Sequence, residues 1–485
     1  MIKNHVKVLI TQNLSITPSA CQLKVIDGFC DFVVSDQPDI ILLMKGFAGT
    51  GKTTLINGFA RTLTSLKINP VLMAPTGRAA KVMAGYTSMP AYTIHKKIYR
   101  QQSSADGTGR FVLDKNLHKN SWFIVDEASM IANSNSENSL FGSGNLLEDL
   151  LEYVYSGFNC RLILSGDTAQ LPPVGYSTSP ALEAAILLGH GFQVSEYILT
   201  EVVRQSIQSG ILFNATKIRN RIEADHAVGY FRFNTEEYTD IERISGEELI
   251  ECITTSYQKY GLYDTTIVTR SNKRANLYNR GVRGSILYRE NEIERGDLLM
   301  IVKNNYYWGK EDSGIDFIAN GEMAEVVSIY GYEEMYGFRF ADVRLRIVDY
   351  DDIEIDCKIF LDSLSIETAS FTFEQNRKLF EQIAEDYTDI TNKRARWKKI
   401  RENPYFNAMQ VKYAYAITCH KAQGSQWPRV IVCVDYSPTI LDNSWIYTSV
   451  TRTSKQCVII GNKKYIKSLI ESRPKSHTRC IGVEL

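Results

Sequence analysis

Eight consecutive residues, from Gly46 to Thr53, read G-F-A-G-T-G-K-T and fit the pattern G-x-x-x-x-G-K-[ST] of a phosphate-binding loop. An apolar run, Ile40–Met44, precedes the loop and a helical pattern, Thr54–Leu66, follows it. The glycines let backbone N–H groups point at phosphate oxygens, Lys52 reaches the β- and γ-phosphates, and the Thr53 hydroxyl ligates Mg²⁺. Because strand and helix are both in place, we favour a nucleotide site over a chance match in a glycine-bearing turn. The residues predicted to hold the nucleotide here are Gly46, Ala48, Gly49, Thr50, Gly51, Lys52, Thr53 and Thr54.

A pair of carboxylates, Asp126 and Glu127, follows the apolar run Trp122–Val125. An acidic residue at the end of a buried strand is costly unless a cation pairs with it. We therefore predict that Asp126 is the carboxylate on the metal side and that Glu127 is the base that orients and polarises the attacking water. The alternative is an acidic pair that only favours a helix N-terminus.

Four short apolar runs occur in the first 175 residues, each followed by a polar or glycine-bearing turn and then a helical pattern. They are Ile40–Met44, Val71–Ala74, Trp122–Val125 and Leu162–Ser165. Uninterrupted apolar strands separated by helices are typical of a parallel sheet that is covered on both faces. Functional loops then lie at the carboxyl ends of the strands, where the phosphate loop and the acidic pair both fall.

In the second half of the chain the sequence pattern differs from that of the first 175 residues. From about residue 284 to residue 361, short alternating runs with Gly and Asn turns predict a small inserted β-barrel. A charged helical segment follows, from about residue 371 to residue 401, and apolar strands then return at Val430–Val434 and Cys457–Ile460. With Thr265–Thr269, these strands predict a second α/β lobe that begins near Tyr197.

The length and composition of the chain indicate how many domains it has and which kinds of protein it is not. Its 485 residues favour two to four domains. Lys and Arg together number 55, as do Asp and Glu, so the net charge is zero and any nucleic-acid groove must be a local positive feature. The nine cysteines form no C-x-x-C pair, which argues against a zinc site or a secreted disulfide framework. No apolar run is long enough to span a membrane and no signal peptide is evident, so we expect a cytoplasmic protein.

Further motifs follow in a fixed order. They are Ala74–Ala80 (APTGRAA), Thr93–His95 (TIH), Gly166–Val174 (GDTAQLPPV), Leu199–Gln205 (LTEVVRQ), Ala416–Ser425 (AITCHKAQGS) and Tyr447–Arg452 (YTSVTR). Together with the phosphate loop and the acidic pair, this series resembles superfamily 1 DNA helicases of the RecD and Dda type, from about residue 17 to residue 455. Residues from about 311 to 405 match the family's patterns poorly.

The resemblance implies an α/β fold of two RecA-like lobes with parallel sheets. A small hairpin pin is expected in the first lobe, and a small SH3-like β-barrel with a helical extension in the second. The expected ranges are 1–175 for the first lobe with a pin-like insertion at about 99–120, 176–283 for the first part of the second lobe, 284–410 for the inserted barrel and helices, and 411–485 for the second part of that lobe.

The resemblance also implies roles at the nucleotide. Gln22 matches the glutamine that reads the adenine edge, so ATP is the expected nucleotide, with Mg²⁺. Gln170 matches the glutamine that senses the γ-phosphate and couples it to the DNA groove. Arg204 and Arg452 match the arginines that the second lobe presents to the γ-phosphate, and Gly424 lies close to both ligands.

A strand track is implied on both lobes, and travel in the 5′→3′ direction is implied with it. Hydroxyls and backbone amides suit such a track because they bind phosphates without reading sequence. The residues expected to line it are Pro75, Thr76, Gly77, Arg78, Thr93 and His95 on the first lobe and Thr418, His420, Lys421, Gln423 and Ser425 on the second. The excursion Gln101–His118 matches in position the pin that splits the duplex in relatives, a plain surface loop being the alternative.

Several alternatives stay open. Asn305–Trp308 either packs the barrel, which we favour, or stacks bases, and the basic run Lys393–Arg401 is either a solvated helix face or a surface near nucleic acid. A P-loop kinase, a non-catalytic binding subunit and an RNA helicase are rival functions. The expected partners are single-stranded DNA and duplex junctions, with single-stranded-DNA-binding, replication or recombination proteins as candidates, and a monomer of bacterial or phage type is expected.

Overall fold

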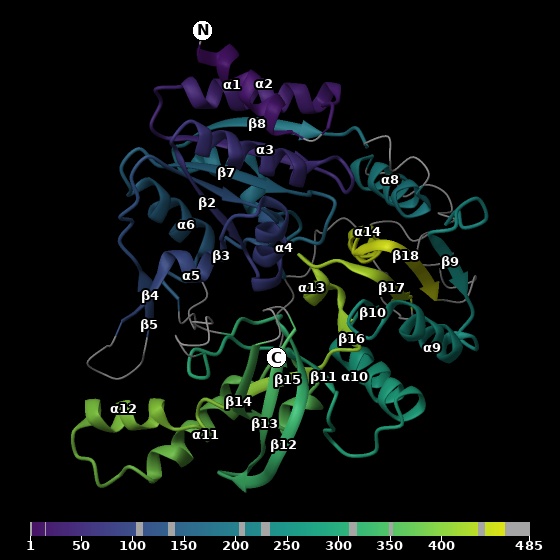
Figure 1. Cartoon of the computed structure of the whole chain (residues 1–485). Helices are drawn as coiled ribbons and strands as arrows, with labels where there is room; N and C mark the ends of the chain where they lie inside the picture. The colour runs from purple at the N-terminus through teal and green to yellow at the C-terminus, as the bar shows by residue number, and fades with distance from the viewer. Residues whose placement is uncertain are drawn as a thin grey trace, which may run out of the picture.

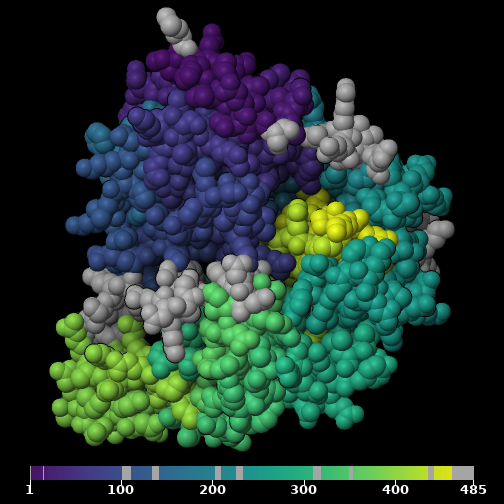
Figure 2. Space-filling model, in the orientation of Figure 1, coloured from purple at the N-terminus to yellow at the C-terminus, as the bar shows by residue number. Residues whose placement is uncertain are grey.

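The computed structural model describes residues 2–14, 16–102, 110–133, 141–202, 209–224, 233–309, 318–348, 353–434 and 442–460. These residues form two α/β lobes and a closed β-barrel (Figure 1). In the space-filling view the first lobe lies above, the second lobe at the right and the barrel with its helices below (Figure 2). The α/β fold with parallel sheets and an inserted barrel is therefore confirmed.

The first lobe contains a six-stranded parallel sheet in the order β3-β2-β6-β7-β1-β8. Its strands are β1 (Ile40–Gly46), β2 (Asn69–Ala74), β3 (Ala91–Thr93), β6 (Ser121–Val125), β7 (Arg161–Gly166) and β8 (Gln193–Leu199). Its helices are α1 (Ile2–Asn13), α2 (Ala20–Val34), α3 (Lys52–Ser65), α4 (Gly77–Thr87), α5 (Ile94–Ile98), α6 (Leu146–Tyr155) and α7 (Ala184–Gly189). The four apolar runs predicted as strands are all confirmed.

Strand β1 shows why an uninterrupted apolar run was needed. Leu42 and Met44 pack into the core beneath α2 and α3, whereas Ile41 and Leu43 pack into the core on the opposite face, beneath α6. Successive side chains of a strand point to opposite faces, so a strand buried on both faces requires an apolar residue at every position.

The second lobe contains a five-stranded parallel sheet in the order β16-β10-β17-β18-β9. Its strands are β9 (Ile241–Ile244), β10 (Thr265–Thr269), β16 (Ala416–Thr418), β17 (Trp427–Cys433) and β18 (Thr453–Ile460). Its helices are α8 (Gly210–Glu223), α9 (Leu249–Tyr260), α10 (Asn272–Gly281), α13 (Cys419–Ala422) and α14 (Asn443–Thr451).

The inserted barrel closes in the order β11-β12-β13-β14-β15, and one apolar core runs through it and the second lobe. Its strands are β11 (Leu298–Ile301), β12 (Met323–Met335), β13 (Phe338–Ile347), β14 (Ile353–Phe360) and β15 (Met409–Tyr413). Helices α11 (Phe373–Glu385) and α12 (Lys393–Glu402) pack on one end of it through a separate aromatic cluster. A two-stranded hairpin, β4 (Tyr99–Gln102) and β5 (Arg110–Leu113), projects from the first lobe.

Two expected boundaries are wrong. The first lobe does not end at residue 175, because β8 pairs in parallel with β1 and completes its sheet up to Leu199. The second lobe therefore begins later than residue 176. The barrel does not end at residue 410 either, since its last strand, β15, runs to Tyr413.

Among the described residues no helix combines the length and the apolar character needed to cross a bilayer.

Candidate nucleotide and strand site

The phosphate loop joins the end of β1 to the start of α3. Gly49 and Gly51 adopt φ values of 77° and 86°, a left-handed backbone that L side chains rarely adopt. Lys52 Nζ donates hydrogen bonds to the carbonyl oxygens of Gly46 at 2.6 Å and Phe47 at 3.1 Å. The ammonium group thus lies over the loop, at the positive end of α3, where an anion is favoured.

Gln22 is fixed against this loop. It is buried in the first turn of α2, where its Nε2 donates to the Thr50 carbonyl at 2.9 Å and its Oε1 accepts from the Ser19 amide at 2.9 Å. The hydrogen bond to Thr50 therefore joins the start of α2 to the phosphate loop, and the capping box with Ser19 orients the Gln22 amide. Recognition of adenine by Gln22 stays a prediction.

Asp126 is half-buried directly after β6, and donors hold both of its oxygens. Oδ1 accepts from Ser165 Oγ at 3.0 Å and from the Glu127 amide at 2.9 Å, and Oδ2 accepts from the Tyr86 hydroxyl at 3.2 Å. Burial raises the pKa of Asp126, and the nearby positive charge of Lys52 opposes that shift. A cation beside Asp126 would stabilise its charged form.

These residues suit Mg²⁺. A carboxylate and a hydroxyl, Asp126 and Thr53, are hard oxygen ligands, and Mg²⁺ usually takes only one or two carboxylates together with phosphate oxygens and waters. Among the described residues no group of three or more His, Cys, Asp or Glu side chains forms an all-protein metal site. A cation held by Asp126 and Thr53 would take its remaining ligands from phosphate oxygens and waters.

The second lobe meets the phosphate loop through helix α14. The Tyr447 hydroxyl accepts a hydrogen bond from the Ala48 amide at 2.9 Å and donates one to Asp167 Oδ2 at 2.7 Å. Thr448 Oγ1 accepts from the Leu171 amide at 2.9 Å. All of these hydrogen bonds join one lobe to the other, so the conformation of the phosphate loop and the position of α14 depend on each other.

Arg452, at the end of α14, faces the acidic pair. Its Nη1 lies 3.7 Å from Glu127 Oε1 and 3.4 Å from the Ser425 carbonyl oxygen, and the residue is only 4% exposed. Arg452 Nε and Gln170 Oε1 are buried without a hydrogen-bond partner among the described residues. Unpaired buried polar atoms are costly, so two groups expected at the γ-phosphate still have donor and acceptor capacity for a ligand. Arg204 lies outside the described residues.

On the first lobe, the predicted track begins at the N-terminus of α4. The Thr76 hydroxyl caps that helix by accepting from the Ala79 amide at 3.2 Å. Pro75 precedes the cap, Gly77 opens the helix, and the Arg78 guanidinium lies 4.3 Å from the centre of the Trp427 ring of the second lobe. A Cβ on Gly424 would lie 3.0 Å from Ala79 Cβ and 3.1 Å from Thr76 Oγ1, so this close approach of the lobes requires glycine.

The second part of the track surrounds α13. Thr418 and Ser425 flank the helix and are buried, and Gln423 Nε2 donates to the Leu171 carbonyl at 2.7 Å. Lys421 Nζ donates to Asn320 Oδ1 of the barrel at 2.7 Å, and burial lowers its pKa to about 8. Burial also lowers the pKa of His420, whose imidazole is consequently neutral at pH 7.

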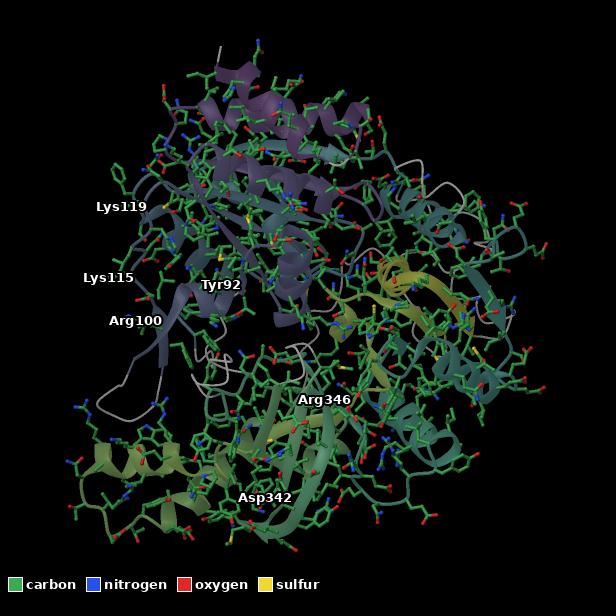
Figure 3. The ribbon with its side chains drawn as sticks, viewed as in Figure 1. Tyr92, Arg100, Lys115, Lys119, Asp342 and Arg346 are labelled. Atoms are coloured by element: carbon green, nitrogen blue, oxygen red, sulfur yellow. The ribbon has the colours of Figure 1, made fainter. Side chains whose placement is uncertain are left out.

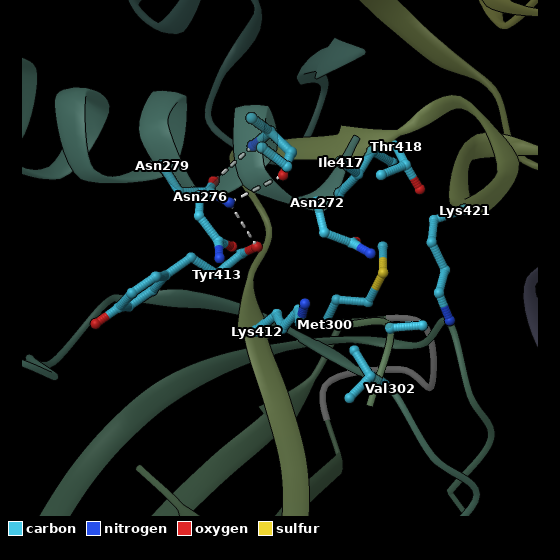
Figure 4. A pocket seen from close by; sticks show the side chains of 13 residues that line it. Asn272, Asn276, Asn279, Met300, Val302, Lys412, Tyr413, Ile417, Thr418 and Lys421 are labelled. Atoms are coloured by element: carbon cyan, nitrogen blue, oxygen red, sulfur yellow. Dashed lines mark hydrogen bonds between the residues drawn. The ribbon is translucent and has the colours of Figure 1, made fainter. Parts of the chain in front are cut away.

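Lys421 and Thr418 line a pocket between α10, α13 and the barrel, together with Asn272, Asn276 and Lys412 (Figure 4).

Thr93 and His95 lie at the base of the hairpin. Thr93 caps α5 by accepting from the Lys96 amide at 3.1 Å. The His95 ring packs against Phe141 at 4.9 Å and lies 5.7 Å from Tyr99. Burial lowers the pKa of His95 to about 4, so it offers no positive charge to a phosphate at neutral pH.

Acidification is expected to destabilise the first lobe through His95. The unfolded chain binds a proton near pH 6.5, whereas the folded imidazole does so only near pH 4, so the free energy of unfolding falls as the pH drops through this window. The effect is at most about 1.4 kcal/mol per pH unit and is absent above pH 6.5. Urea denaturation at pH 7, 6 and 5 checks it. His95→Gln should have a shallower pH dependence than the unaltered chain, and equal slopes would contradict the assignment.

The pin-like excursion is confirmed as an antiparallel hairpin in the described residues 99–102 and 110–113. Phe111 of β5 stacks on Phe141 at 4.6 Å and lies 5.0 Å from Tyr306 of the barrel segment. Arg100 forms an ion pair with Asp114 at 3.0 Å, on the same side of the lobe as Lys115 (Figure 3). The hairpin is thus supported by the barrel, although its role in strand separation stays a prediction.

Asn305–Trp308 packs against the barrel, the alternative favoured from the sequence, whereas a place near nucleic acid for the basic run Lys393–Arg401 stays a prediction. Trp308 Nε1 donates to the Asn407 carbonyl at 2.9 Å, and Asn305 anchors the same turn, although Tyr306 and Tyr307 stay 38% and 37% exposed. In the basic helix α12, Trp397 packs edge-on against Phe380 at 4.8 Å. Its aromatic ring therefore belongs to the cluster that holds α12 on the barrel.

Three residues of this site, Asp167, Tyr447 and Tyr86, were not identified from the sequence. Asp167 lies in the motif Gly166–Val174 and Tyr447 is the first residue of the motif Tyr447–Arg452. Both are therefore close in sequence to predicted site residues. Tyr86 follows no motif. Only the tertiary structure brings its hydroxyl to Asp126.

The sequence matches the family model of the AAA domain over residues 32–230 and that of the UvrD-like helicase C-terminal domain over residues 413–460. The chain is 25% identical over 434 residues to the ATP-dependent RecD2 DNA helicase of Deinococcus radiodurans, an alignment that covers 87% of this chain and 47% of the relative. It is 23% identical over 442 residues to the ATP-dependent DNA helicase dda of Enterobacteria phage T4, covering 84% of this chain and 92% of that relative.

The chain thus spans about half the length of the first of these relatives and most of the second. A crystal structure of Pif1 helicase from Bacteroides in complex with ADP-AlF3 and ssDNA is similar over 93% of this chain and 94% of that one, with a TM-score of 0.48 and 14% identity.

Proposed function

We propose that this chain, which is a superfamily 1 helicase of the RecD and Dda type, uses ATP hydrolysis to travel 5′→3′ along single-stranded DNA and to open duplex DNA ahead of it. One observation carries the proposal. Arg452 of the second lobe lies 3.7 Å from Glu127 of the first lobe, so residues of both lobes share one buried site beside the phosphate loop.

In the proposed reaction, the backbone of the phosphate loop and Lys52 hold the β- and γ-phosphates. Thr53 and Asp126 hold Mg²⁺, which offsets the charge of the phosphate oxygens when it is bound. The Glu127 carboxylate orients the attacking water and accepts its proton. Arg452 faces the charge that develops on the γ-phosphate, as an arginine finger supplied within one chain.

Motion follows from the difference in affinity between the open and the closed arrangement of the lobes. Nucleotide favours closure because Arg452 and Tyr447 reach the site only from the second lobe. Hydrolysis removes that preference, and the lobes reopen. Leu171, next to Gln170, is held by Thr448 on one side and by the track residue Gln423 on the other. This contact links the γ-phosphate side of the site to the strand.

The remaining features of the proposal follow from the same relatives. ATP and Mg²⁺ are the substrate and the cofactor, single-stranded DNA and duplex junctions are the ligands, and the protein works as a monomer in the cytoplasm. Replication or recombination proteins are the proposed partners. An RNA helicase is the second candidate, since the predicted track reads phosphates rather than the 2′-hydroxyl.

Strand displacement tests the function directly. Duplexes with a 5′ tail, a 3′ tail or no tail are incubated with ATP and Mg²⁺. The 5′-tailed duplex is expected to be opened, with ATP hydrolysis stimulated by an oligo(dT) strand. Opening of only the 3′-tailed duplex would contradict the polarity, and hydrolysis that DNA leaves unchanged would favour a kinase or a regulatory NTPase. Stimulation by oligo(U) but not oligo(dT) would favour an RNA helicase.

A further inference from the structure

Helix α4 connects the predicted strand track to the metal side of the nucleotide site. Its first turn carries Thr76 as the cap and Arg78 over Trp427 of the second lobe. A Cβ on Gly77 would lie 3.0 Å from Ala319 Cβ of the barrel, so three parts of the molecule meet at this turn. Tyr86 lies in the last turn of the 11-residue helix, about 13 Å further along its axis.

The Tyr86 hydroxyl contacts Asp126, the carboxylate predicted to hold the cation. It donates a hydrogen bond to Asp126 Oδ2 at 3.2 Å. A tyrosine hydroxyl is protonated at neutral pH, and here it acts as a hydrogen-bond donor to Asp126. Because Ser165 and the Glu127 amide hold the other oxygen of Asp126, the Tyr86 hydrogen bond fixes the remaining freedom of this carboxylate.

We propose that Tyr86 is a positioning residue that orients Asp126 toward the nucleotide-bound divalent cation, and that α4 transmits strand binding to the cation through it. This inference rests on the proposed function, and it adds a route between strand and nucleotide that is separate from the contacts of Gln170 and Gln423.

The physical basis is the stiffness of a short helix and the sensitivity of metal sites to their outer hydrogen bonds. A phosphate bound at Thr76–Arg78 changes the position of the first turn, and the hydrogen-bonded helix carries that displacement to Tyr86. A partner that orients a metal ligand typically changes metal affinity by about 10- to 100-fold. Strand and nucleotide must then affect each other's affinity by the same factor.

Tyr86→Phe removes the hydroxyl and keeps the ring. Binding of fluorescent N-methylanthraniloyl-ADP is titrated with MgCl₂, and the midpoint in Mg²⁺ is expected to rise by about 10- to 100-fold in the variant. Tyr155→Phe is the matched control, because it removes a half-buried phenol hydrogen bond, to the Ile40 carbonyl at 2.7 Å, at the opposite end of β1. The control should leave the midpoint unchanged, and thermal melting of both variants tests for general loss of stability.

The second measurement is the ratio of nucleotide affinities with and without oligo(dT), at saturating Mg²⁺. The ratio for Tyr86→Phe is expected to approach one, while Tyr155→Phe keeps that of the unaltered chain. An unchanged Mg²⁺ midpoint in Tyr86→Phe would overturn the positioning role, and a shifted midpoint with an unchanged ratio would overturn transmission through α4. Failure of the proposed function is seen separately, as an absence of strand-stimulated hydrolysis in the unaltered chain.

Discussion

Replacement of Lys52 by alanine is expected to abolish ATP hydrolysis, by at least about 10²-fold, while single-strand binding stays within a few-fold of that of the unaltered chain. The ammonium group lies over the phosphate loop, 2.6 Å from the Gly46 carbonyl oxygen, and no backbone amide can supply its full positive charge to the γ-phosphate. The predicted track, from Thr76 to Arg78 and around α13, does not include Lys52. The measurement is steady-state hydrolysis with saturating oligo(dT), together with strand binding by fluorescence anisotropy.

Lys119→Ala is the control for this experiment. Lys119 is exposed at the edge of the first lobe, away from the nucleotide site (Figure 3), so its removal changes the net charge equally and leaves hydrolysis intact. Strand-stimulated hydrolysis retained by Lys52→Ala would refute the assignment of the phosphate loop.

Arg452 is expected to act mainly on kcat. Arg452→Ala should lower kcat by about 10³- to 10⁵-fold, the range for an arginine finger, and change nucleotide affinity much less. Arg452→Lys should also fail to restore the rate, because lysine lacks the planar fork that reaches two oxygens at once. Since Arg452 is 4% exposed and contacts Glu127 and Ser425, its position depends on docking of the second lobe.

Single-turnover hydrolysis and nucleotide titration separate these two effects. Arg61→Ala, on the exposed side of α3, is the control, and thermal melting excludes unfolding as the cause. A rise in KM with an unchanged kcat would show that Arg452 only binds nucleotide and would remove the finger role. The corresponding role of Arg204 stays a prediction, because that residue lies outside the described part of the chain.

Much of the fold was predictable because its signals are local. The phosphate loop is defined by glycines and a lysine at fixed spacing, and β1, β6 and β7 contain apolar runs because both faces of the sheet are covered. Strand β8 was not predicted, because it lacks the apolar run that marks the central strands. It lies at the edge of the sheet, several of its side chains are exposed, and its sequence lacks an apolar run.

The sequence by itself determined the chemistry of the phosphate loop and the acidic pair, since each depends on residues that are neighbours along the chain. Only the tertiary structure decided which residues complete the site. Tyr447 meets Ala48 across 399 positions, and Tyr86 meets Asp126 from a helix whose local pattern shows only an ordinary amphipathic face. Such pairings depend on how two lobes and a helix pack together, and the energy that sets this packing is spread over the whole core rather than encoded at either residue.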